Sequence, residues 1–324
     1  SIMAPKKSPP KGKGKDKDKP SKRKKMPFLS AAAKDKWGEY ENAGVIFGKS
    51  VKWEDFKRWH LKSLFKKVGL LQIHDLHEFV YPELIRIFYC NLSVTWDLKK
   101  FSTHVNGIAI VITVETICEI FGIPNTNVTH YFWPNGDYTE VIPDVKITDT
   151  ICNSTYPRGE KLCHQMYLND TAKLIARFLA YNVVPRAGHY DALQPLQVLM
   201  IYAIMTGWEL NFGHIIFHHM INEDKRKGSL PYGMALTVIF KHFGVDFEDQ
   251  LYDNQRPLWF NRDTAVKMNI VESGKRKLPQ VSEQKAPEED LYKRKKVSLG
   301  VEQRLDRIEG KQDQILRLLV NNNP

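Results

Sequence analysis

The chain has 324 residues, of which 42% are hydrophobic and 11% aromatic, so it holds enough apolar side chains to build a sizeable core. This composition excludes a wholly disordered protein. The formal net charge is +11, and the location of that charge decides whether it indicates a binding surface or charged tails.

The positive charge lies towards the two ends of the chain. Residues 1–25 contain 11 Lys or Arg and two Asp, and residues 273–300 contain eight basic and four acidic residues. Residues 26–272 contain 25 basic and 27 acidic residues, so this central body is close to neutral. The sequence therefore does not predict a basic groove on the body.

The start of the chain has almost no apolar side chains. Residues 1–27 are therefore predicted to form a disordered basic tail, because they cannot offset the entropy cost of ordering. Residues 28–50 are predicted to be a poorly defined lead-in, with folded structure starting near Trp37 or later.

Helical spacing of apolar residues begins at residue 51. It predicts a helix over residues 51–70 that ends at Gly69, and a second helix over residues 81–92 with Pro82 in its first turn. The apolar positions of the first helix are Trp53, Phe56, Trp59, Leu64 and Val68.

The pattern then changes to β-branched and aromatic residues. Residues 93–101 and 105–113 are predicted to form two strands or a hairpin, and hence a small sheet. Residues 113–124 are predicted to be a helix that is capped by Thr113 or Thr116 and ends at Gly122. Residues 125–165 show no regular pattern.

Four strong helical segments follow, over residues 169–184, 193–208, 211–228 and 231–245. Four predicted helices end in a glycine that precedes an apolar residue, which is typical of a left-handed C-terminal cap. These glycines are Gly69, Gly122, Gly207 and Gly244. The predicted fold is mainly α, with a minor β element, over residues 51–250.

The end of the chain is predicted to be a linker, residues 251–297, followed by a short coiled-coil helix, residues 298–321. Apolar residues there recur at alternating intervals of four and three, and one polar residue in the seam would help to set the register. The alternative is a single amphipathic helix. The seam consists of Val301, Leu305, Ile308, Gln312, Ile315 and Leu319.

Four blocks of the sequence, taken in order, resemble the family called the putative plant transposon protein domain. The resemblance implies a plant protein derived from a mobile element, often a retrotransposon, and implies no catalytic residues. The blocks are YPELIRIFYCNL at 81–92, VNGIAIVITVETICEIFGIP at 105–124, VVPRAGHYDALQPLQVLMIYAIMTGWELNFGHIIFHHMI at 183–221 and LPYGMALTVIFKHFGV at 230–245.

Residues that could hold a metal ion form only incomplete sets. His214 and His218 lie one helical turn apart, but the sequence lacks the glutamate of an HExxH motif. Cys152, Cys163 and His164 lack the spacing of a zinc ribbon or knuckle. We therefore expect no metal, no cofactor and reduced cysteines, including Cys90 and Cys118, and treat both sets as minor alternatives.

Catalytic signatures are also missing from the sequence. A metal-dependent nuclease would need converging carboxylates, and Asp144, Asp149 and Asp170 lie in a segment without the strand pattern of a ribonuclease-H-like fold. The chain is therefore interpreted as a non-enzymatic protein. Arg86, Arg158, Arg177 and Arg186 are too dispersed in the sequence to predict a basic patch.

The large aromatic side chains could stack on nucleic-acid bases if they were exposed. Most of them lie in apolar patterns, so core packing is favoured over a stacking platform. They are Trp53, Trp59, Tyr89, Trp96, Phe132, Trp133, Trp208 and Trp259.

Two clusters of four basic residues remain, each within polar sequence. An import receptor could read such accessible clusters, and they would also contact DNA or RNA phosphates without reading the base sequence. A solubilising tail is the alternative. The clusters are Lys22, Arg23, Lys24 and Lys25, and Lys293, Arg294, Lys295 and Lys296.

Together these features predict a nuclear binding and assembly module that self-associates through its C-terminal helix, with the cytoplasm as the alternative location. The longest apolar stretch, residues 196–208, is shorter than the ~20 residues that cross a bilayer, so no membrane partner is expected. Two alternatives are a capsid-like structural protein of a retroelement and a diverged enzyme.

Overall fold

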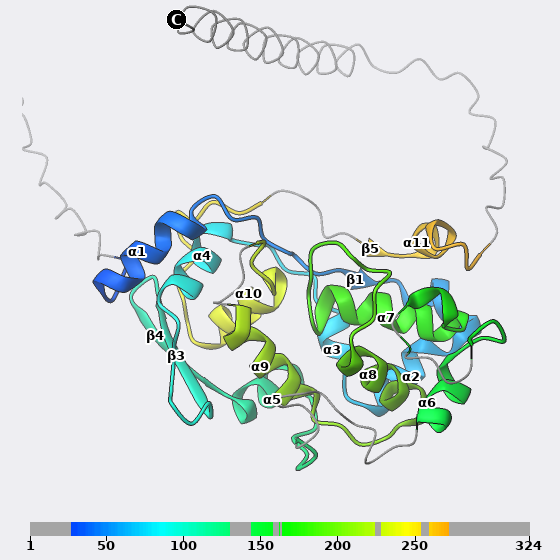
Figure 1. Cartoon of the computed structure of the whole chain (residues 1–324). Coiled ribbons are helices and arrows are strands. Elements are labelled where there is room, and N and C mark those ends of the chain that lie inside the picture. Colours follow the sequence, from blue (N-terminus) through cyan, green and yellow to red (C-terminus); the bar gives the residue numbers. More distant parts are fainter. Residues whose placement is uncertain are drawn as a thin grey trace, which may run out of the picture. The chain divides into compact units, whose positions relative to one another are not determined.

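The computed structural model contains two groups of helices and strands (Figure 1). Buried side chains from both groups form one hydrophobic core. The structure describes residues 27–129, 144–157, 162, 164–223, 228–253 and 259–271. In chain order the elements are α1 (Ala31–Tyr40), β1 (Ser50–Val51), the 3-10 helix η1 (Trp53–Trp59), α2 (Leu61–Lys67), α3 (Leu71–His74), α4 (Pro82–Cys90), β2 (Ser93–Val94), β3 (Lys100–Val105), β4 (Ile108–Thr113), α5 (Val114–Phe121), α6 (Asp144–Ile151), the 3-10 helix η2 (Gln165–Tyr167), α7 (Asp170–Asn182), α8 (Pro195–Thr206), α9 (Phe212–Glu223), α10 (Gly233–His242), β5 (Trp259–Phe260) and α11 (Arg262–Lys267).

Contacts between elements define the two groups. In one, α4 packs against α1, β3 and α10, while α5 packs against β4, α9 and α10. In the other, α7 and α8 pack against each other and contact α3, α2 and α6. The mainly α fold with a small sheet is confirmed, and no helix within the described ranges is long and apolar enough to cross a membrane.

The predicted hairpin is present. β3 and β4 pair antiparallel from Lys100↔Thr113 to Val105↔Ile108, and β2 adds a short third strand at the edge. Asn106 and Gly107 make the turn with positive φ of 48° and 86°, as a two-residue hairpin turn requires. Alternate β3 side chains point into the core, so the sheet covers one side of α4.

The predicted helix ends are confirmed. Thr113 caps α5 and forms a capping box with Thr116, and Gly122 ends this helix with φ 61°. The other three predicted cap glycines also have φ between 73° and 76°. Left-handed glycines therefore end these helices, as their sequence positions predicted.

The segment predicted as one helix over 51–70 is two helices. η1 buries Trp53, Phe56 and Trp59, which are spaced three apart, and α2 starts after His60, whose φ is 52°. A spacing of three places side chains on one face of a 3-10 helix, whereas an α-helix would spread them around its surface. The exact repeat of three was the signal for this break.

Ordered structure begins earlier than predicted. α1 starts at Ala31 in the segment taken as a poorly defined lead-in, and the Ser30 hydroxyl caps it by accepting a hydrogen bond from Ala33 N at 3.1 Å. Its apolar face is too weak to predict a helix by itself, because only Ala33 and Tyr40 are buried. Packing against α4 supplies the remaining stabilisation.

Three further elements lie where the sequence predicted none. α6 lies within residues 125–165 and buries Ile147 and Ile151, although that region was predicted to be irregular. β5 and α11 lie within the predicted linker, residues 251–297: β5 pairs in parallel with β1 and buries Phe260. The packed domain therefore extends to residue 271.

Candidate functional site

A cavity of about 190 Å³ lies where α9 meets the start of α8 and the loop that joins α7 to α8. Both apolar and polar side chains line it, and the polar ones include three histidines of α9. The lining residues are Val184, Arg186, Gln194, Leu196, Gln197, Met200, His214, Ile215, His218, His219 and Asn222. We call this cavity the histidine pocket.

The start of α9 fixes the position of the histidines. The buried Asn211 caps the helix by accepting a hydrogen bond from His214 N at 2.8 Å, and its amide donates to Thr126 O at 2.6 Å. Gly213 lets α9 approach α5 closely, because a Cβ there would lie 2.3 Å from the Cys118 sulfur. The backbone that carries the histidines is thus held against α5 and the segment that follows it.

His214 and His218 lie on the same face of α9, with ring centroids 4.2 Å apart. His219 packs edge-on against Tyr232, with ring centroids 5.4 Å apart. Burial lowers the pKa of His214, and burial followed by the charge of His214 lowers the pKa of His218 to about 4. Both imidazoles are therefore neutral at pH 7, so they can accept a hydrogen bond or bind a metal ion.

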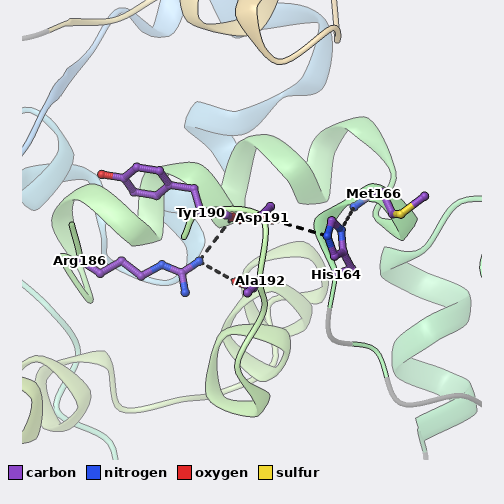
Figure 2. A network of polar contacts seen from close by, with 6 residues as sticks. All are labelled: His164, Met166, Arg186, Tyr190, Asp191 and Ala192. Carbon is purple, nitrogen blue, oxygen red and sulfur yellow. Dashed lines mark hydrogen bonds and ion pairs between the residues drawn. The ribbon is translucent and has the colours of Figure 1, made fainter. Parts of the chain in front are cut away.

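The α7–α8 loop contributes Arg186 to the lining of the histidine pocket. Figure 2 shows the polar contacts that hold this loop. Nη2 of Arg186 donates hydrogen bonds to Ala192 O at 2.7 Å and to Tyr190 O at 3.4 Å. Asp191 Oδ2 lies 3.6 Å from His164 Nε2, which ties the same loop to the segment that leads into η2. Arg186 therefore both closes the loop and places a cation beside the histidines.

This cation makes the pocket a poor metal site. Arg186 would repel a bound divalent cation, and the structure, within the ranges it describes, has no group of three or more His, Cys, Asp or Glu side chains positioned to hold one. Zinc at His214 and His218 stays a minor prediction. Cys163, which belongs to the second set, lies outside the described residues.

The predicted acidic residues are distributed over two helices. Asp149 is exposed on α6, and Asp170 is the exposed first residue of α7. The Asp144 side chain lies outside the described residues.

Core packing holds for four of the six described aromatic residues of this set, because Trp208 is partly buried against the core. Trp53, Trp59 and Tyr89 are buried, whereas Trp96 is 95% exposed and Trp259 is 40% exposed. Trp96 lies in the turn between β2 and β3, where no element covers it. Phe132 and Trp133 lie outside the described residues, as do both basic clusters and the whole predicted coiled-coil seam.

The arginines, predicted to be dispersed, lie partly together. Burial lowers the pKa of Arg186, and the nearby charge of Arg177 lowers it further. Sequence reasoning also missed Lys49, Tyr181 and Tyr190, which line one cavity. The one local signal was the spacing of Arg177 and Tyr181, one turn apart on α7.

Comparison with known proteins identifies the class of this helical domain. The family model described as a putative plant retrotransposon-related domain matches residues 58–246. The match covers more than half of the chain, so the protein belongs to this family, and the resemblance found in the sequence is confirmed. No curated protein and no solved structure matches the chain.

Proposed function

We propose that this plant retrotransposon-related protein is a non-catalytic binding and assembly module that enters the nucleus and contacts nucleic acid without sequence preference through its two lysine-rich clusters. The distribution of charge carries the proposal. The 25 basic residues of positions 26–272 are balanced by 27 acidic ones, whereas residues 1–25 carry 11 basic and two acidic residues. Phosphate contacts therefore belong to the clusters.

The first cluster is joined to a fixed point on the body. The buried Asn91 donates from Nδ2 to Pro27 O at 2.7 Å and to His104 O at 2.8 Å, and its Oδ1 accepts from Leu29 N at 3.0 Å. These bonds hold the chain against β3 two residues after Lys25. A phosphate chain bound by the cluster would therefore be kept close to this face of the body.

The C-terminal heptad pattern supplies the assembly step. Three heptads are too short for a stable isolated helix, so the seam favours association with a second copy. Each added copy brings two more basic clusters to the same nucleic acid. Several weak contacts would then act together, and the overall affinity would rise without any new contact surface.

Nuclear entry gives a direct test. The chain is fused to a fluorescent protein, so that the fusion is too large to diffuse through nuclear pores. Replacing all eight residues of the two clusters with alanine should then reduce its nuclear accumulation several-fold. The matched control replaces four exposed lysines of the body, Lys62, Lys66, Lys99 and Lys100, and should accumulate normally. Equal accumulation of the cluster variant and the parent would contradict the proposal.

Histidine protonation gives a prediction for the body. As the pH falls from 6.5 to about 4, the unfolded chain takes up a proton at His218 that the folded chain does not, so the free energy of unfolding falls. Uptake of one full proton by the unfolded chain alone would lower the free energy of unfolding by ~1.4 kcal/mol per pH unit. His218→Gln should remove part of this pH dependence, and only part, because His218 keeps some solvent contact.

Urea denaturation at several pH values measures this effect. The exposed His242, at the end of α10, provides the control: His242→Gln should keep the pH dependence of the parent. His74 is fully buried and has its pKa lowered to about 4, mainly by burial, so it contributes equally to both variants. An unchanged slope for His218→Gln would show that this histidine is accessible to protons in the folded state.

A further inference from the structure

A second cavity, of about 440 Å³, is lined by the segment before β1, by Tyr181 of α7 and by Tyr190 of the α7–α8 loop. Lys49, Arg86, Tyr181 and Tyr190 supply most of its polar side chains, and Asp253 is the acid among its lining residues. We call it the lysine–tyrosine pocket. Its residues come from segments that are distant in the sequence.

Asn182 fixes Lys49 in this pocket. Its Oδ1 accepts a hydrogen bond from Lys49 N and its Nδ2 donates to Lys49 O, both at 2.8 Å. The buried amide thus replaces a neighbouring strand at this point of the backbone. As a result the Lys49 ammonium lies 3.9 Å from the ring centroid of Tyr181, the residue next to Asn182.

A second cation stacks on the second tyrosine. Arg177 Cζ lies 4.6 Å from the ring centroid of Tyr190, and the rings of Tyr181 and Tyr190 lie 5.3 Å apart. Two rings and two cations therefore form one cluster. Such stacking orients the cations but leaves their full positive charge in place.

The electrostatics of Tyr181 report this positive charge. Burial is the largest single effect and raises its pKa, but hydrogen bonding and charge from Lys49, together with the charge of Arg177, outweigh burial and lower the pKa. These surroundings favour negative charge on the Tyr181 oxygen, whereas burial and the charge of Tyr181 raise the pKa of Tyr190. Within the part of the chain that the structure describes, neither Lys49 nor Arg177 forms an ion pair with a carboxylate.

We propose that the lysine–tyrosine pocket binds a phosphate group, held by Lys49 beside the two tyrosine rings. Arg177 is not among the lining residues but stacks on Tyr190, and it adds positive charge to the same cluster. Lysine and arginine donors suit phosphate oxygens, and hydroxyl groups of tyrosine can donate to the same anion. The volume accepts a phosphate with an attached sugar. This site lies on the body and goes beyond the proposed function, which places the nucleic-acid contacts in the clusters.

Calorimetric titration of the full chain tests the site with three probes: inorganic phosphate, a nucleoside monophosphate, and a short single-stranded oligonucleotide with or without a 5′-phosphate. Binding of inorganic phosphate is expected. A gain with the monophosphate would identify a nucleotide ligand, and a gain that needs the 5′-phosphate would identify a strand end. The absence of binding to all three would overturn the proposal.

Variants assign the binding to these side chains. Lys49→Met and Arg177→Met should each weaken phosphate binding at least tenfold, whereas Lys173→Met, one turn before Arg177 on α7, should bind as the parent does. Asp253→Asn removes a negative charge from the lining and should bind more tightly, a gain that a misfolded variant could not give. Unchanged affinity in Lys49→Met, or no gain in Asp253→Asn, would overturn the proposal.

Two further measurements separate this site from the basic clusters. Phosphate should raise the pKa of Tyr181, because the bound anion offsets the charges that lower it, and absorbance of the phenolate follows this change. The variant with alanine at all eight cluster positions should bind phosphate as the parent does. If it lost phosphate binding, the clusters and not the pocket would hold the anion.

Discussion

Phe178→Ala should lower the free energy of unfolding by about 3–5 kcal/mol, the usual cost of removing a buried phenylalanine side chain. Phe178 lies on α7 and is 1% exposed. Its ring centroid lies 4.1 Å from that of Phe260, 5.4 Å from that of Phe56 and 5.5 Å from that of Phe65. Truncation would open a cavity between four elements, which could not all move inward to fill it.

Urea denaturation at neutral pH measures this loss. Trp96 provides the control because it is a large aromatic residue that is 95% exposed, so Trp96→Ala should change stability by no more than about 0.5 kcal/mol. A loss below about 1 kcal/mol for Phe178→Ala would contradict the aromatic core described here.

The same substitution should loosen β5. Phe260 packs on Phe178, and its carbonyl accepts a hydrogen bond from Lys52 N at 3.0 Å. The Lys52 amide should therefore exchange with solvent faster in Phe178→Ala than in the parent, by more than the global loss of stability explains. If the Lys52 amide exchanged faster only by the amount that the global loss of stability explains, β5 would be held independently of α7.

Local patterns predicted much of the fold. The Thr113 cap, the glycine helix ends and the Asn106–Gly107 turn depend on residues within a few positions of one another, so the sequence alone could locate them. α1 could not be located in this way because its stability depends on α4, which lies more than 40 residues further along the chain.

Long-range contacts account for the missed parts of the candidate sites. The pairing of β1 with β5 joins residues 50–51 to residues 259–260, and only the folded chain brings them together. Lys49 meets Tyr181 because of two hydrogen bonds to Asn182, which is 133 positions away. A charge count along the sequence does not show which residues meet in the folded chain. A body that is close to neutral in total can therefore contain a local cluster of cations.

Nucleic-acid binding should depend on the two basic clusters and on salt. If six or more of their eight side chains contact phosphates, the affinity of the full chain should fall on the order of 10³-fold between 50 and 200 mM salt. Replacing all eight with alanine removes these contacts, so affinity at low salt should fall strongly. Base sequence should have little effect, because lysines in such clusters offer point charges and no fixed donors for base edges.

The same variant should keep the stability of the parent, since none of the described core residues, which run from Tyr40 to Ile270, belongs to the clusters. Replacing the exposed body lysines Lys62, Lys66, Lys99 and Lys100 should leave the salt dependence unchanged. A large drop in unfolding temperature for the cluster variant would show that the clusters belong to the fold.

The slope of binding affinity against salt concentration, both on logarithmic scales, measures how many phosphate contacts the protein makes. We predict a steep negative slope for the full chain and a shallow one for the variant that lacks all eight basic side chains. A variant that kept the slope and affinity of the parent would place the nucleic-acid contact on the body and contradict the proposed function.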